Sequence, residues 1–148
     1  MANARSFFSI EDDRLVVDSI RKAEKHTSGE IRVHLEDHCK QDPVTRAIEV
    51  FEKLDMHKTA ARNGVLFYLA VQDHKFAIVG DQGIDEQVPE DFWDHIKDDM
   101  QTAFRKGDFV GGLSRGILEA GKALSDHFPY AGDDKDINEL PDELSIGE

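Results

Sequence analysis

The residues best suited to chemistry are oxygen-bearing side chains at the ends of predicted strands. Glu30 begins one predicted strand, Asn63 precedes the next, and Asp81 follows a third, with Asp85 in the same loop. The expected topology brings these strand ends together at one edge of a sheet, by which we mean the border formed by the ends of its strands. Converging carboxylate and amide oxygens are the ligands that Ca²⁺ and Mg²⁺ prefer. We therefore predict a divalent-cation site formed by Asp81, Asp85, Glu30 and Asn63.

A purely structural interpretation of the same residues stays open. In it, Glu30 and Arg62 pair on the surface, Asn63 and Gly64 form a turn, and Asp81 accepts a hydrogen bond from a backbone amide. The sequence alone does not decide between this interpretation and the cation site.

A second acidic group follows the strands at the opposite edge. Glu36, Asp37 and His38 come after the first predicted strand, and Asp73 and His74 lie in a short hairpin. Ligands of open α/β sheets commonly bind in the crevice beyond the carboxyl ends of the parallel strands. Glu36, Asp37 and Asp73 are therefore our second choice for the cation ligands. The structural alternative is a turn at Asp73 and an exposed acidic loop at Glu36 and Asp37.

Other motifs give weaker evidence for a functional site. Residues 134–138 read DKDIN, the opening of an EF-hand loop, but Glu139 replaces the required glycine and Ser145 the final glutamate. An acidic, solvated tail is the better interpretation of that segment. Cys39 beside His38 lacks an evident third group that would make it a nucleophile. The chain contains no Walker phosphate loop, no G-x-G-x-x-G and no G-x-S-x-G motif.

Hydrophobic periodicity indicates the elements that must position these residues. We expect a first helix that starts near Ser9 and stops at residues 27–29, with Leu15, Val16, Ile20 and Ala23 inward. Further helices are expected from Asp42 to about Met56, over residues 92–104, and from a cap at Asp108 to Phe128. Strands are expected over residues 31–35, 65–71 and 76–79.

The order of these elements predicts an α/β fold. Strand, helix and strand form a βαβ unit with parallel strands, and the short turn at residues 72–75 returns the next strand antiparallel. Strand 65–71 is apolar on both faces and should be central. About four helices would then cover a small mixed sheet on two faces, as a three-layer α/β/α sandwich. We expect residues 1–128 to form this domain and residues 129–148 an acidic tail, packed in part through Ile137 and Leu140.

Composition narrows the function classes. The 148 residues carry 18 Lys and Arg against 31 Asp and Glu, a net charge of −13. Such a charge disfavours nucleic acid and anionic membranes as partners and favours cations. The single cysteine suits a reducing compartment, and the longest apolar run, residues 65–71, is too short to span a bilayer. We expect a cytoplasmic protein without a signal peptide.

Four ordered sequence blocks carry a resemblance to a known family. They are SGEIRV at residues 28–33, RNGVL at 62–66, GDQGI at 80–84, and FRKGDF at 104–109 with the glycines that follow it. Over residues 11–128 the chain resembles the TPM domain family, named for a thylakoid lumen protein, a photosystem II repair protein and a modulator of an acetylcholine receptor. The resemblance implies an α/β/α sandwich, a divalent-cation site of acidic loop residues and, for some members, weak phosphatase activity. The chain looks like a short, stand-alone bacterial cytoplasmic member.

Two functional hypotheses follow. The first is a protein that binds Ca²⁺ or Mg²⁺, with phosphatase activity that is weak at most and catalytic residues that are unknown. Only Arg62 and Arg105 are evident as clamps for a phosphate group, which makes efficient hydrolysis doubtful. The alternative is a non-catalytic interaction module, whose acidic surface or tail binds a basic protein partner.

Overall fold

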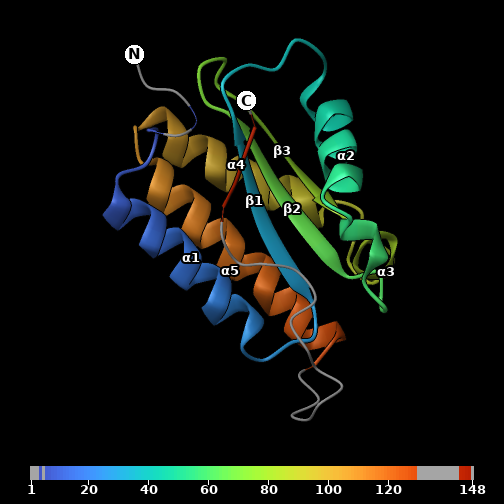
Figure 1. Cartoon of the computed structure of the whole chain (residues 1–148). Coiled ribbons are helices and arrows are strands. Elements are labelled where there is room, and N and C mark those ends of the chain that lie inside the picture. The colour runs from blue at the N-terminus through green and yellow to red at the C-terminus, as the bar shows by residue number, and fades with distance from the viewer. Residues whose placement is uncertain (1–3, 5, 130–143, 148) are drawn as a thin grey trace.

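A computed structural model describes residue 4, residues 6–129 and residues 144–147 of the chain. Its elements are α1 (Ile10–Glu24), β1 (Glu30–Glu36), α2 (Pro43–Lys53), η1 (Met56–Lys58), β2 (Gly64–Ala70), β3 (Lys75–Gly80), α3 (Gln82–Asp85), α4 (Phe92–Arg105), α5 (Phe109–His127) and β4 (Ser145–Ile146) (Figure 1). Each long helix and strand that periodicity predicted is present.

The strands form one mixed sheet in the order β3-β2-β1-β4. β1 and β2 run parallel, and β3 returns antiparallel to β2, so the predicted βαβ unit and hairpin are confirmed. Every residue of β2 is buried. The expectation that this strand is central is confirmed as well.

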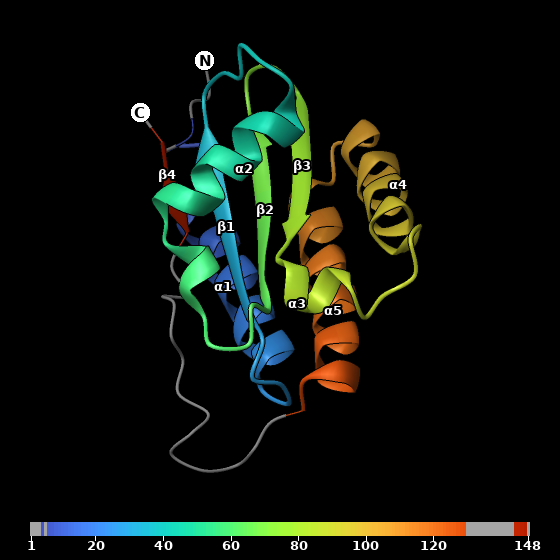
Figure 2. The same ribbon diagram turned by 90° about the vertical axis from the view of Figure 1, so that its right-hand side faces the viewer.

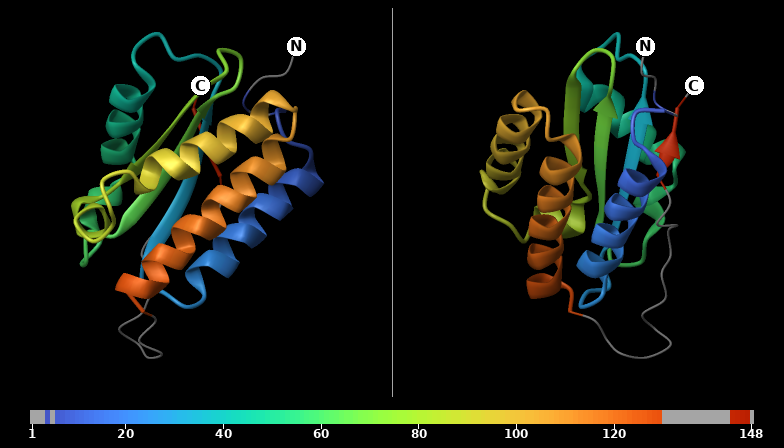
Figure 3. Two further views of the ribbon diagram at one scale, coloured as in Figure 1. Left: turned by 180° about the vertical axis from the view of Figure 1, so that it is seen from behind. Right: turned by 90° about the vertical axis from the view of Figure 1, so that its left-hand side faces the viewer.

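Helices cover both faces of the sheet. α5 lies between α1 and α4 on one face, and α2 lies on the other, where Met56 of the short η1 joins its core (Figures 2 and 3). Alternate strand residues supply the two cores: Val33 and Phe67 pack towards α1 and α5, whereas Leu66 and Tyr68 pack towards α2. The predicted three-layer α/β/α sandwich is confirmed.

Local capping explains where several helices begin. The Ser9 side chain accepts from Asp12 N, the Asp42 side chain from Thr45 N, and the Asp108 side chain from Gly111 N. Each cap satisfies a backbone donor that the first helical turn would leave unbonded. Gly107, which ends α4, has a φ of 83°, in the left-handed region that favours glycine.

Some helix details differ from the prediction. α1 ends at Glu24, short of residues 27–29, because the Thr27 hydroxyl donates to Phe128 O and ties this turn to the end of α5. α2 ends at Lys53, because Asp55 adopts a left-handed φ of 58° that no helix continues through. The assignment of Leu15 to the inner stripe of α1 is wrong: its side chain is 53% exposed.

The segment expected to be a tail supplies the fourth strand. Ser145 and Ile146 pair in parallel with His34 and Leu35, and Gly147 N donates to Leu35 O at 2.7 Å. The predicted packing of Ile137 and Leu140, and the EF-hand-like residues 134–138, lie outside the described residues. Within the described ranges, no helix has the length and apolar content needed to cross a membrane.

Candidate functional site

The first-choice site residues do lie near one edge of the sheet. Glu30 pairs with Gly64, next to Asn63, and Val65 pairs with Gly80, next to Asp81. Asp81 N also donates to Gly64 O at 2.9 Å. The side chains of Glu30, Asn63 and Asp81 are all buried.

Asp81 is held by an arginine. Arg62 Nε lies 2.7 Å from Asp81 Oδ2, and Arg62 Nη2 lies 2.8 Å from Oδ1, which also accepts from Gln82 N at the start of α3. The pair is fixed further by Gly83, whose N donates to Arg62 O at 2.8 Å. A cation at Asp81 would therefore compete with a bidentate arginine and a helix cap.

The other members of the first-choice group have separate partners. Asn63 Nδ2 donates to Ser28 Oγ at 3.3 Å, and Asp85 Oδ1 accepts from Trp93 Nε1 at 3.0 Å. Among the described residues, Asn63 Oδ1 has no hydrogen-bond donor. Asn63 Oδ1 is thus an open acceptor at this edge, while the carboxylates of Asp81 and Asp85 are both engaged.

The opposite edge contains a buried ionic network around Glu36. Arg46 reaches it from α2 with Nε 3.0 Å from Oε2 and Nη2 2.5 Å from Oε1. Tyr68 OH donates to Oε2 at 2.6 Å, and His34 Nε2 lies 3.2 Å from Oε1. Burial raises the pKa of the Glu36 carboxyl, but these hydrogen bonds outweigh burial and lower its pKa to about 2.

His34 links this network to β4. Its Nδ1 lies 2.8 Å from Ser145 Oγ, while its Nε2 faces Glu36. Burial lowers the pKa of His34 more than the neighbouring carboxylate raises it, so the imidazole is neutral at pH 7. A neutral ring can donate through Nε2 to Glu36 and accept at Nδ1 from the serine hydroxyl. Glu36 is therefore a structural residue.

Asp37 and Asp73 lie beyond that network on adjoining loops. Gln72 N donates to Asp37 O at 2.9 Å, and the Asp37 side chain accepts from Ala4 N at 2.6 Å. Asp73 accepts from Cys39 N at 2.7 Å and contacts His38 Nδ1 at 2.9 Å. The hydrogen bond from His38, followed by that from Cys39 N, lowers the pKa of Asp73.

An open hollow of about 580 Å³ adjoins these loops and is lined by residues 36–41 and Arg46. The Asp73 side chain is 29% exposed, against 5% for Asp81. No three His, Cys, Asp or Glu side chains in the described ranges are arranged to hold a metal ion. Any cation at this edge would therefore depend on few protein ligands and on water.

Arg46 and Tyr68 were not predicted from the sequence as partners of Glu36. Arg46 lies in the middle of an amphipathic helix, and Tyr68 in a uniformly buried strand. The sequence feature that could have indicated such partners was Glu36 itself, because a carboxylate at the end of a buried strand needs compensating hydrogen-bond donors.

The fold and these edges define a class of small α/β/α domains with acidic residues at the strand ends. The chain belongs to the TPM domain family, whose model matches residues 2–123. It is similar to the BA42 protein from the psychrophilic bacterium Bizionia argentinensis, with 46% identity and a TM-score of 0.88. That match covers 99% of this chain and 100% of BA42, whose structure was solved by NMR.

More distant solved structures share the fold. The N-terminal domain of a protein from P. gingivalis matches with 20% identity and a TM-score of 0.65, over 82% of this chain and 78% of that one. The N-terminal domain of cg2496 from Corynebacterium glutamicum matches with 16% identity and a TM-score of 0.59, over 80% of this chain and 74% of that one. The search of curated proteins found no match.

Proposed function

We propose that this TPM domain protein is a cytoplasmic binder of divalent cations, and that it binds them at the edge formed by Asp37 and Asp73. The observation that carries the proposal is the contrast between the edges. Asp81 is buried against Arg62, whereas Asp73 is partly exposed and accepts from Cys39 N, and Cys39 and Asp37 line an open hollow. A hydrated cation can reach the second edge without displacing an arginine.

Asp37 and Asp73 would hold the ion through carboxylate oxygens, and water would complete its coordination. Mg²⁺ commonly binds through one or two carboxylates and retains several waters, whereas Ca²⁺ requires more oxygen ligands. The existing hydrogen bonds to Ala4 N and Cys39 N orient the carboxylates without using all their lone pairs. We therefore expect weak cation binding that favours an ion with few protein ligands.

Phosphatase activity, if present, would be weak. A bound cation supplies charge that polarises a phosphoryl oxygen. Arg62 and Arg46 add little to this, because Arg62 is held by Asp81 and Arg46 by Glu36. An arginine engaged by a carboxylate is a poor clamp for a phosphate group.

An amide NMR titration of metal-stripped, full-length protein with Ca²⁺ and separately Mg²⁺ tests the proposal. Saturable shifts at Asp37, His38 and Asp73 are expected, and the variants Asp37→Asn and Asp73→Asn should each weaken binding several-fold. Asp55→Asn is the matched control, because Asp55 forms only an exposed pair with Lys58. Shifts centred on Asp81 and Asn63 would move the site to the first-choice edge. Absence of saturable shifts would reject cation binding.

The interaction module is the second candidate. The acidic composition favours a basic protein partner. Pairing of Ser145 and Ile146 with β1 weighs against a wholly free tail, because docking through these residues would cost their sheet contacts. A partner that binds the full chain but not a chain ending at Phe128 would support this candidate, and equal binding by both would reject a role for the tail.

A further inference from the structure

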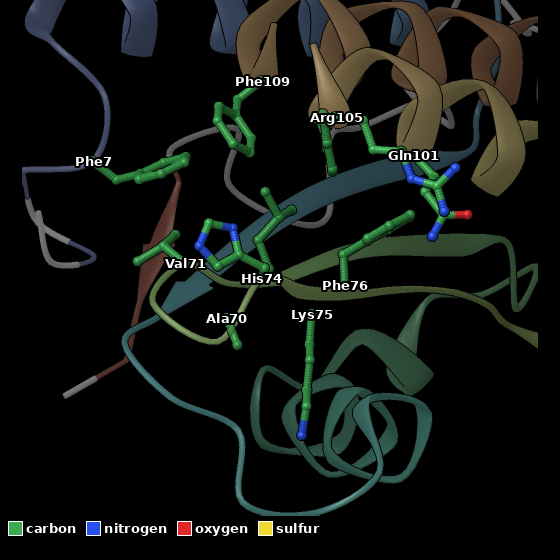
Figure 4. A pocket seen from close by; sticks show the side chains of 11 residues that line it. Phe7, Ala70, Val71, His74, Lys75, Phe76, Gln101, Arg105 and Phe109 are labelled. Carbon is green, nitrogen blue, oxygen red and sulfur yellow. The ribbon is translucent and has the colours of Figure 1, made fainter. Parts of the chain in front are cut away.

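A separate cavity of about 230 Å³ lies between the β2–β3 turn and the facing ends of α4 and α5. It adjoins the carboxyl end of β2, the region of an open α/β sheet where ligands commonly bind. Leu69 and Phe76 line it from the sheet, Phe104 from α4 and Phe109 from α5. Figure 4 shows the rings of Phe7, Phe76 and Phe109 around this space.

The walls are aromatic and mutually packed. The ring of Phe104 lies 5.1 Å from that of Phe76 and 5.2 Å from that of Phe109, and Phe7 lies 5.1 Å from Phe109, all between centroids. These contacts fix the rings, so the cavity is formed without a ligand. Its volume is below the roughly 300–1,000 Å³ of sites for drug-sized ligands, which limits the occupant to about one ring.

The polar rim is basic. His74, Lys75 and Arg105 line the cavity, and no Asp or Glu is among its described lining residues. This is unusual for a chain with 31 acidic and 18 basic residues. The Lys75 ammonium points away, donating to Cys39 O at 3.2 Å, so Arg105 supplies the charge at the cavity (Figure 4).

Arg105 has no carboxylate partner among the described residues, unlike Arg46 and Arg62. Arg105 and Gln101 both line the cavity from α4 (Figure 4). The shallower surface next to the cavity includes Asp94, Asp98 and Lys97, so both signs of charge occur outside the cavity. An anionic group at the rim would gain a charge-assisted hydrogen bond from Arg105.

We propose that this cavity binds a small organic anion, with an apolar ring packed against the side chains of Phe76, Phe104 and Phe109 and its anionic group at Arg105. A carboxylate and a phosphate ester share this chemistry. The site requires no metal ion, so the inference goes beyond the cation binding proposed above and can fail or succeed separately from it.

The test is an amide NMR titration of full-length protein in EDTA with phenylacetate and, in a second arm, phenyl phosphate. We expect saturable shifts at Leu69, Phe76, Arg105 and Phe109 for at least one probe. The neutral analogue 2-phenylethanol should bind about tenfold more weakly, because it lacks the charged partner for the guanidinium. A preference between the two arms identifies the class of anion.

Arg105→Gln should weaken anion binding about tenfold, since a hydrogen bond to a charged group is lost. Lys106→Gln is the matched control, because Lys106 is the exposed neighbour at the same helix end and does not line the cavity. The proposal is overturned if 2-phenylethanol binds as well as the anions, or if both variants lose equal affinity for the anion. It is also overturned if no saturable shift occurs up to about 10 mM probe, which corresponds to roughly 3 kcal/mol of binding free energy.

Discussion

Arg46 holds the buried carboxylate of Glu36 through one edge of its guanidinium, with Nε 3.0 Å from Oε2 and Nη2 2.5 Å from Oε1. The two residues join α2 to the end of β1, and Tyr68 and His34 complete the shell of donors. An ionised group at this depth is tolerated because each oxygen is compensated. A cation at Glu36 would have to displace these donors.

Glu36→Gln should destabilise the fold by roughly 2–3 kcal/mol at pH 7, because the Arg46 charge loses its counterion. The pKa of Glu36 falls from a model-compound value of 4.5 to about 2 on folding. Its stabilising effect is therefore present above about pH 4.5 and lost as the pH falls towards 2. Urea unfolding should show a gap between wild type and variant that narrows over that range. Glu49→Gln, which alters an exposed partner of Arg46, should stay within about 0.5 kcal/mol of wild type.

The Arg62–Asp81 pair should behave as a structural unit. Asp81→Ala removes two ionic hydrogen bonds and the cap of α3, and we expect a loss of about 2–3 kcal/mol. A double-mutant cycle with Arg62→Ala, followed by urea unfolding, should show that the losses from the two single variants are not additive. Additive losses would mean that the pair contributes little to stability.

Gly83→Ala should be strongly destabilising. A Cβ atom there would lie 2.2 Å from Ala61 O and 2.4 Å from Arg62 O, both backbone atoms that cannot rotate away. We expect a loss of about 2 kcal/mol or more, in line with overpacked sites, measured by thermal and urea unfolding. Gln82→Ala, at an exposed neighbouring position, should change stability by less than about 0.5 kcal/mol. Similar values for the two variants would contradict this close approach.

Deletion of residues 144–148 should leave the outer side of β1 without a paired strand. Without β4, His34 loses the Ser145 hydroxyl, and Leu35 O loses the Gly147 donor. An unpaired strand edge is a template for association. Sedimentation should therefore show concentration-dependent dimers that the full chain does not form, and unfolding should show a loss of about 1–2 kcal/mol. A monomeric truncation of unchanged stability would show that β4 contributes nothing.

Elements with a strong periodic signal could be predicted from the sequence. β2 is apolar throughout, and the caps at Ser9, Asp42 and Asp108 are local features with a local cause. β4 could not be predicted, because Ser145–Ile146 is too short to show a strand period and depends on a distant partner. Leu15 shows the limit of periodicity, since an apolar residue at the border of a stripe can remain exposed.

For the candidate site, topology predicted which residues share an edge, but not which side chains pair. Arg62 contacts Asp81 while its own backbone has a φ of 52°. No local sequence pattern revealed this left-handed conformation. Arg46 lies ten positions from Glu36 in sequence and meets it only because α2 packs over the sheet. Such pairings depend on tertiary geometry and decide which carboxylates are left for ligands.

The parallel pairing of β4 with β1 also sets an order of events during synthesis. Ser145 follows His34 by 111 positions, so β1 is made long before the strand that flanks it. At about 5–20 residues per second, the delay is on the order of ten seconds. During that time the nascent sheet presents an open side to neighbouring chains, and chaperone contact at β1 would be most useful in this interval.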